Sequence, residues 1–285
     1  MSHSNPFSVS TLGAGLKELC GTSKTQSGKH IRPIHRHLSE RLVLEGGFPP
    51  EWLLPSPPLS SKRIKSKDCL QYKPSASDQA ERSVLGGIKP KNVDVTVFEP
   101  GIGPALGISA KSTGNAFRNL TNRMEEALGD CANIHMMYPG FVFGFLHFIK
   151  FAKLGRVAPP DASFDANGKP LEKLVRYHDV LVSLSGRTTI TDPAMRYESV
   201  GLIVVCCDGD GARVLPDYPP TSSPVHFSKF FRRLYEIFDL RFAYPDGTAR
   251  NRRRSWCLPN LAIPCQHDLV TGFPWEVRLE EDAES

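Results

Sequence analysis

The feature that most constrains the fold is a strand, turn and strand pattern before the middle of the chain. Residues 92–98 alternate apolar and polar side chains and are rich in β-branched residues, which predicts a strand. Gly101, Gly103 and Pro104 then form a turn, and residues 106–112 return as a second strand, antiparallel to the first. This hairpin begins a region in which strands and helices interleave.

The segments after the hairpin indicate the fold class. A helix is expected at residues 115–129, because its apolar residues form one stripe and Gly129 marks its end. Two further strands and two further helices are expected at residues 138–151 and 200–207 and at residues 171–184 and 226–238. The interleaving predicts an α/β protein with a mixed central β-sheet flanked by helices on both faces.

The first part of the chain has a different composition. Residues 1–75 are rich in Ser, Pro and Lys, with one expected helix at residues 34–44. Because such a segment offers little core, we interpret it as a basic N-terminal arm or loose subdomain. A further helix is expected to start at residues 77–81 and to stop at Gly86. The expected division is an arm at residues 1–75, a core at 76–245 and an extension at 246–285.

The charge is unevenly distributed. Of the 285 residues, the first 91 hold fourteen Lys and Arg against seven Asp and Glu, although the whole chain carries only +5. A second basic cluster, residues 250–254, precedes an acidic tail. Basic runs of this kind suit a polyanion, because each cation set against a phosphate releases counterions. A solvated surface is the alternative interpretation.

Cysteine and histidine give no framework for a disulfide network or a zinc site. The seven cysteines are scattered, without a CxxC pair, and are expected to be reduced packing residues. Cys257, Cys265 and His267 have unsuitable spacing for zinc. The histidines of the basic stretch, His30, His35 and His37, are expected on a solvated surface. The motif at residues 208–211 resembles part of a calcium loop, but a tight turn accounts for it better.

No targeting or membrane segment is evident. The longest apolar run, residues 141–151, is interrupted by Gly144, His147 and Lys150, whereas a span needs about 20 apolar residues. The first ten residues have neither a basic nor an apolar region of a secretory signal. A cytoplasmic protein without membrane contact is therefore expected.

Two charged residues in the hairpin suggest chemistry. Asp94 interrupts an otherwise apolar strand and Lys111 lies near the end of the next strand, so the hairpin places them at neighbouring positions. Buried charges are costly unless they are paired or bind a metal. The alternatives are a structural ion pair or the solvent face of a half-exposed hairpin.

The pattern around these residues, Val-Asp94-Val-Thr-Val followed by Ile-Ser109-Ala-Lys111, resembles the core of the PD-(D/E)xK nucleases. The superfamily has an acid where Ser109 stands. One branch, the type II restriction endonucleases that cut sites with a CCGG core, has the same Ser-x-Lys motif and takes its carboxylate from the following helix. Glu125 matches that position, thirteen intervening residues after Lys111, with Glu126 as the neighbour that could replace it.

The resemblance implies a restriction-endonuclease-like core and a Mg²⁺ site. Asp94, the carbonyl of Ala110 and Glu125 would hold the ion, and Lys111 would activate the attacking water. Glu81 on the preceding helix is a further candidate, with a surface helix residue as the alternative. Residues implied to contact DNA are Arg118, Asn122 and Arg123. Only Arg118 fits the base-reading run of those enzymes, so no target sequence is implied.

The function implied is a Mg²⁺-dependent endonuclease that hydrolyses DNA phosphodiester bonds, most simply a type II restriction enzyme acting on double-stranded DNA. Cutting both strands symmetrically would require a homodimer or homotetramer. One alternative is a PD-(D/E)xK nuclease of repair, recombination or phage defence. An alternative from another class is an inactive nuclease-like module that only binds nucleic acid or protein.

Overall fold

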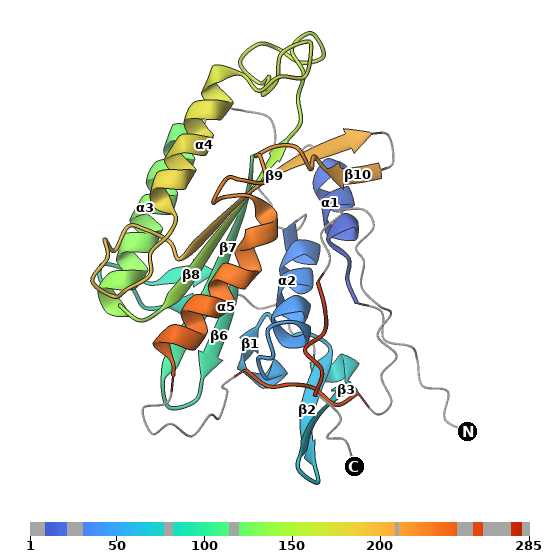
Figure 1. Ribbon diagram of the computed structural model, residues 1–285, viewed down its shortest axis with the longest axis vertical. Helices are drawn as coiled ribbons and strands as arrows, with labels where there is room; N and C mark the ends of the chain where they lie inside the picture. The colour runs from blue at the N-terminus through green and yellow to red at the C-terminus, as the bar shows by residue number, and fades with distance from the viewer. Residues whose placement is uncertain are drawn as a thin grey trace.

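A mixed six-stranded sheet forms the centre of the molecule (Figure 1). The structure is a computed structural model that describes residues 9–21, 31–76, 82–113, 120–208, 211–243, 253–258 and 275–280. The strand order is β1-β6-β7-β8-β9-β10. The bounds of these strands are β1 (Leu53–Leu54), β6 (Val95–Glu99), β7 (Gly103–Thr113), β8 (Val142–Lys150), β9 (Ser199–Asp208) and β10 (Gly211–Val214).

The strand directions follow from the connections. β1, β6 and β7 are antiparallel neighbours, and the turn between β6 and β7 contains Gly101 and Gly103 at φ of +86° and +98°. Glycine suits these positions because other residues rarely adopt such angles. Helices α3 (Leu120–Met137) and α4 (Glu172–Leu184) separate the parallel strands β7, β8 and β9. The expected antiparallel hairpin and mixed sheet are confirmed.

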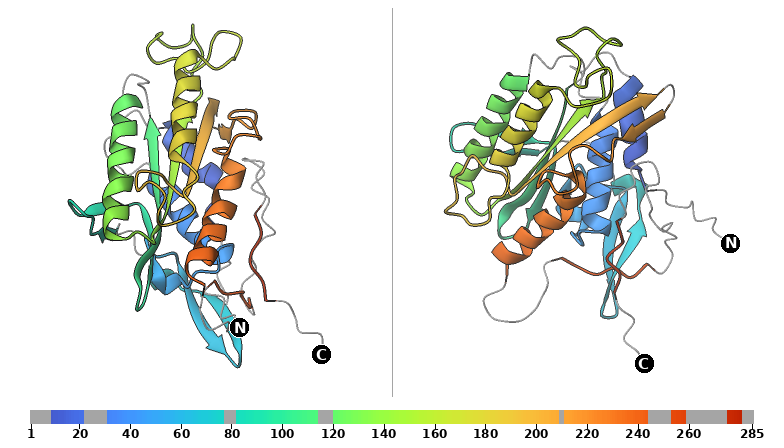
Figure 2. Two further views of the ribbon diagram at one scale, coloured as in Figure 1. Left: turned by 60° about the vertical axis from the view of Figure 1, so that its left-hand side comes forward. Right: turned by 45° about the horizontal axis from the view of Figure 1, so that its top comes forward.

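Helices cover both faces of the sheet (Figure 2). One face packs on α3 and α4, and the other packs on α1 (Leu12–Gly21), α2 (Arg32–Leu44) and α5 (Phe230–Arg241). β8 alternates between these cores, with Phe145 facing α3 and α4 and Leu146 facing the other side. Gly144 allows α5 close to the sheet, because an added Cβ would lie 2.7 Å from Phe230 Cζ.

Short elements complete the described chain. They comprise two hairpins, formed by β2 (Leu59–Ile64) with β3 (Lys67–Tyr72) and by β4 (Arg82–Val84) with β5 (Lys91–Val93), and the 3-10 turns η3 (Pro50–Trp52), η4 (Pro74–Ala76) and η6 (Phe227–Lys229). The helix expected up to Gly86 is wrong at residues 82–84, where backbone groups of β4 pair with β5. Its expected start, residues 77–81, lies outside the described residues.

Other expected elements are confirmed with shifted ends. The segments predicted at 138–151, 171–184, 200–207 and 226–238 correspond to β8, α4, β9 and η6 with α5. The expected end of α3 at Gly129 is wrong, because the helix continues to Met137. Cys131 and Ile134 beyond the glycine are buried in the core beneath the helix, so tertiary packing outweighs the unfavourable helix propensity of one glycine.

The expectation that residues 1–75 contribute little core is wrong. Leu16 of α1 and Leu42 of α2 are fully buried, and both belong to the core that includes strand residues of the central sheet. The helix predicted at residues 34–44 is confirmed as α2. His35 and His37 on this helix are also buried, which contradicts their expected solvated position, whereas His30 lies outside the described residues.

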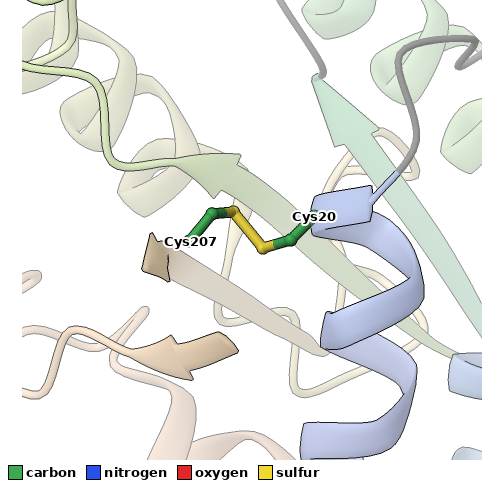
Figure 3. Close-up of a disulfide and its surroundings, with 2 residues drawn as sticks. All are labelled: Cys20 and Cys207. Carbon is green, nitrogen blue, oxygen red and sulfur yellow. A yellow bond between two sulfur atoms is a disulfide. The ribbon is translucent and has the colours of Figure 1, made fainter. Parts of the chain in front are cut away.

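A disulfide joins Cys20 at the end of α1 to Cys207 near the end of β9 (Figure 3). The expectation of reduced cysteines is therefore wrong for this pair. The two residues are 187 positions apart in sequence, and only the packing of α1 on the sheet brings their Cα atoms to 5.6 Å. Among the described cysteines, Cys69, Cys131, Cys206 and Cys257 are free.

Candidate functional site

Asp94 lies at the break between β5 and β6, where the chain leaves one small hairpin and enters the central sheet. The register pairs Val95 with Ile108, which sets Asp94 beside the end of β7. Its Oδ2 accepts hydrogen bonds from the amide of Ala110 at 2.8 Å and from the hydroxyl of Ser109 at 3.1 Å. Ser109, which lacks the charge of an acid, therefore positions the Asp94 carboxylate.

Two nitrogen-bearing side chains approach the same carboxylate. Lys111 Nζ lies 3.6 Å from Asp94 Oδ2, and His35 Nε2 lies 3.8 Å from Oδ1. The expected proximity of Asp94 and Lys111 is confirmed. His35 arrives from α2, which contacts β6. This histidine was not expected at the site, because its segment was interpreted as an arm with little core.

The Asp94 carboxylate lines a polar pocket of about 400 Å³ near the carboxyl end of β7. Its lining residues are Lys89, Pro90, Lys91, Asn92, Asp94 and Lys111. Three of them are lysines and one is an aspartate, and the two acidic residues of α3 that contact Lys91 balance part of this positive charge. The pocket therefore presents ammonium and carboxylate groups together.

Acidic residues of α3 border this pocket. Lys91 Nζ lies 2.6 Å from Asp130 Oδ2 and 3.7 Å from Glu126 Oε1. Burial raises the pKa of Glu126, but Arg123, Lys111 and Lys91 outweigh it and hold that pKa below its ordinary value. The Glu126 carboxylate therefore belongs to the charge cluster of the pocket. Glu126 and Asp130 are four residues apart, about one helical turn, and this spacing was the sequence feature that indicates two acids on one face of α3.

Glu125, the acid implied by the resemblance, points elsewhere. It is exposed, and no contact of its side chain is seen within the described part of the chain. One residue corresponds to about 100° around a helix, so adjacent glutamates face different surroundings. The structure brings Glu126 to the lysines of the pocket and leaves Glu125 in solvent.

The residues implied to contact DNA are only partly described. Asn122 is exposed at the start of α3. Arg123 is half-exposed, and its guanidinium donates a 2.7 Å hydrogen bond to Glu126 Oε2. Arg118 and Glu81 lie outside the described residues. Of the two described residues, Arg123 therefore contacts an acid of the pocket's charge cluster.

A buried pair lies beside the site on β8. The register sets His147 next to Lys111, and His147 Nδ1 is hydrogen-bonded to the hydroxyl of Tyr177 from α4. Burial, together with repulsion from Arg123 and Lys111, lowers the pKa of His147 to about 3. The imidazole is therefore neutral at physiological pH and adds no charge next to Lys111.

The carboxylate oxygens at the site are of the type that a hard cation prefers. Asp94 and Glu126 supply carboxylate oxygens, which Mg²⁺ prefers, and this ion commonly takes only one or two protein carboxylates and keeps several waters. Within the residues that the structure describes, no group of three or more His, Cys, Asp and Glu side chains is arranged to hold a metal. The described carboxylates at the pocket are Asp94, which lines it, and Glu126 and Asp130, which contact Lys91.

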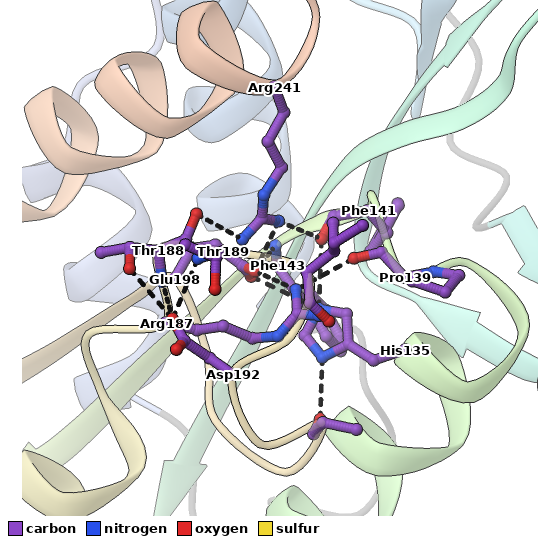
Figure 4. A network of polar contacts seen from close by, with 12 residues as sticks. His135, Pro139, Phe141, Phe143, Arg187, Thr188, Thr189, Asp192, Glu198 and Arg241 are labelled. Atoms are coloured by element: carbon purple, nitrogen blue, oxygen red, sulfur yellow. Dashed lines mark hydrogen bonds and ion pairs between the residues drawn. The ribbon is translucent and has the colours of Figure 1, made fainter.

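A second charged cluster lies at the opposite end of β8 and β9 (Figure 4). The buried carboxylate of Glu198 contacts Arg241 at 2.6 Å, Arg187 at 2.8 Å and His135 at 3.4 Å. It also accepts a 2.7 Å hydrogen bond from the amide of Phe143. These partners come from α3, β8, α5 and the segment after α4, so the cluster joins both helical layers to the sheet.

The described arginines of the basic cluster at residues 250–254 form ion pairs within the fold. Arg253 is buried and pairs with Asp239 at 2.6 Å, and Arg254 pairs with Asp68 at 3.2 Å. These arginines anchor the chain near its C-terminus against α5 and the β2–β3 hairpin. Arg250 and Arg252 lie outside the described residues. β9 ends at Asp208 and β10 begins at Gly211, so the motif at 208–211 joins two antiparallel strands.

Comparisons with protein-family models, with curated proteins and with solved structures found no match to this chain. The residues of the site are therefore the basis for inferring a function. Among the helices in the described part of the chain, none combines the length and apolar character that a membrane crossing requires.

Proposed function

We propose that this protein is a Mg²⁺-dependent endonuclease that hydrolyses phosphodiester bonds of double-stranded DNA, with a restriction-endonuclease-like core. The observation that carries the proposal is the grouping of Asp94, Ser109 and Lys111 at one end of a hairpin, beside a pocket that contains two further lysines. A type II restriction enzyme, working as a homodimer or homotetramer, is the specific form proposed.

The charges of the pocket support phosphodiester chemistry. Lys89, Lys91 and Lys111 line it together. Although Lys91 also pairs with Asp130, these ammonium groups would attract a backbone phosphate and stabilise the charge that develops on its oxygens. Asp94 is held in one orientation by Ser109 and the Ala110 amide, so its carboxylate is preorganised. A Mg²⁺ ion bound by Asp94 and Glu126 would supply a Lewis acid for the phosphoryl oxygen.

Lys111 is the residue best placed to act on water. Its side chain is one quarter exposed and its ammonium is 3.6 Å from the Asp94 carboxylate. An ammonium there can donate a hydrogen bond to the attacking water and keep it near the phosphorus. The neutral His147 beneath it leaves this positive charge in place without adding a second one.

The proposal is tested by incubating the full chain with mixed plasmid DNA, with and without Mg²⁺, and sequencing the fragment ends. We expect cleavage only with Mg²⁺, and discrete fragments with one shared end sequence. A smear would contradict the restriction activity and favour a nonspecific nuclease. DNA binding without cleavage under all conditions would contradict the nuclease and leave a nucleic-acid binding module.

The helix-borne acid is distinguished by two single variants. We expect Glu126→Gln to reduce the Mg²⁺-dependent cleavage rate by about a hundredfold or more, because it removes a charged group from the pocket. Glu125→Gln should stay within about threefold of the unaltered protein, since its side chain is exposed and contacts nothing described. The initial rates of plasmid nicking at saturating Mg²⁺ measure both effects.

Comparing Glu125→Gln with Glu126→Gln decides which of the two acids acts at the site. An inactive Glu125→Gln protein beside an active Glu126→Gln protein would return the role to the residue at the spacing of the CCGG-core enzymes. Two fully active variants would remove α3 from the site. The melting temperatures of both variants, compared with that of the unaltered protein, separate loss of chemistry from loss of fold.

A further inference from the structure

A further pocket, of about 430 Å³ and lined by basic residues, lies at the carboxyl ends of β8 and β9. Its charged lining residues are Lys150, Lys153, Arg156 and Arg213, together with Asp161. Among the described lining residues, four cations thus face one carboxylate. The volume lies in the range of small-molecule sites, and the excess of positive charge selects an anion.

The topology explains why the two pockets are neighbours. β7, β8 and β9 are parallel, so their carboxyl ends lie along one edge. Lys111 lies near the end of β7, Lys150 ends β8, and Cys207, which also lines the pocket, lies near the end of β9. At the usual strand spacing β7 and β9 are about 10 Å apart, and carboxyl ends of parallel strands are where ligands bind in α/β sheets.

Two cations of this pocket, Lys153 and Arg156, are available to an anion. Within the described residues, neither Lys153 nor Arg156 forms an ion pair, and Lys153 Nζ lies 5.8 Å from the centroid of the Phe151 ring. Burial lowers the pKa of Lys150, which shows that its ammonium has lost part of its hydration. A guanidinium beside ammonium groups matches the oxygens of a phosphate, because Arg donates two parallel hydrogen bonds and Lys adds a point charge.

We propose that this pocket binds a phosphate ester, held by Lys150, Lys153, Arg156 and Arg213. The same chemistry has two sources, a backbone phosphate of a DNA strand that also reaches Lys111, or a free phosphorylated small molecule. The DNA source depends on the proposed function, whereas phosphate binding itself does not. Phosphate contacts away from the cleaved bond would fix the position of a strand on the protein.

The experiment measures binding of two probes to the full chain in the presence of EDTA, so that no cleavage is needed. A fluorescent 20-base-pair duplex is titrated by anisotropy at several salt concentrations, and adenosine monophosphate is titrated by calorimetry. The variant Lys153→Glu with Arg156→Glu reverses two pocket charges. The matched control, Arg176→Glu with Arg232→Glu, reverses two exposed charges on α4 and α5, whose side chains are 77% and 79% exposed.

We expect the pocket variant to bind the duplex at least tenfold more weakly and to lose about two units of salt slope, one for each phosphate contact. The control should change duplex binding by less than threefold. Loss of adenosine monophosphate binding alone would identify the small-molecule source. Unchanged binding of both probes, or an equal loss in the control, would overturn the proposal.

A neutral variant and a cleavage assay separate phosphate binding from protein folding and from nuclease activity. The neutral variant Lys153→Gln with Arg156→Gln, checked by thermal melting, replaces the charge-reversal variant if that protein does not fold. If the duplex binds through the pocket but Mg²⁺ never produces cleavage, the nuclease proposal fails while the phosphate pocket stands.

Discussion

Replacing Asp94 by Asn, or Lys111 by Met, is expected to lower the rate of Mg²⁺-dependent DNA cleavage by about a hundredfold to a thousandfold. Each change removes one charge from the preorganised group at the end of the hairpin, and a single such group is commonly worth about two to three orders of magnitude in rate. The asparagine side chain of Asp94→Asn keeps an oxygen that can accept from the Ala110 amide, so the strand junction should persist. Single-turnover cleavage of a labelled duplex measures the loss.

The controls are Asp179→Asn and Lys169→Met, which make the same changes at exposed positions. Both should cleave at the unaltered rate. Duplex binding in EDTA should stay within about tenfold for all four proteins, because the basic surface supplies most of the affinity. Cleavage by Asp94→Asn or Lys111→Met at the unaltered rate would show that Asp94 and Lys111 form only a structural ion pair.

The sequence was sufficient for the parts of the fold that depend on local pattern. The turn glycines adopt positive φ angles and the hairpin pairs as expected. The single strand predicted at residues 92–98 is wrong, because the chain breaks at Asp94 between β5, which pairs with β4, and β6, which pairs with β7. The contribution of α1 and α2 to the core depends on which sheet face those helices cover. A segment rich in Ser, Pro and Lys gives no sign of that distant surface, and the same is true of the Cys20–Cys207 disulfide.

At the candidate site, too, the sequence predicts local contacts but not contacts between distant segments. The hairpin register was enough to predict that Asp94 and Lys111 are neighbours, because pairing across a turn is local. The helix-borne acid was expected from a count of residues, and a count does not fix which side of α3 faces the pocket. His35 joins the site from a helix about sixty residues earlier, which no motif in the hairpin indicates.

The buried cluster around Glu198 provides the largest expected effect on stability. Glu198→Ala should lower the free energy of unfolding by about 3–5 kcal/mol, because it leaves Arg187, Arg241 and His135 without their shared counter-charge. All four side chains are at most 6% exposed, so water cannot replace the carboxylate. Urea unfolding followed by circular dichroism measures the change.

Acid should mimic this substitution in the unaltered protein. Burial raises the pKa of Glu198, but His135, Arg241 and the Phe143 amide outweigh it, so the pKa in the folded state lies below the ordinary value. A carboxyl with a depressed folded pKa stabilises the fold above its unfolded pKa, and that contribution disappears as the pH falls through the folded pKa. Glu198→Ala should therefore lose part of the steep decline in stability below about pH 4.5.

Glu172→Ala is the matched control, because Glu172 forms a 2.5 Å ion pair with Arg176 while both side chains are 77% exposed. Exposed pairs of this kind contribute at most about 1 kcal/mol, so this variant should unfold at nearly the unaltered urea concentration. An equal effect of the two variants would show that the Glu198 cluster gives the protein no more than a surface ion pair does. A large effect confined to Glu198→Ala would identify this cluster as the contact that fixes both helical layers on the sheet, at the end opposite the candidate site.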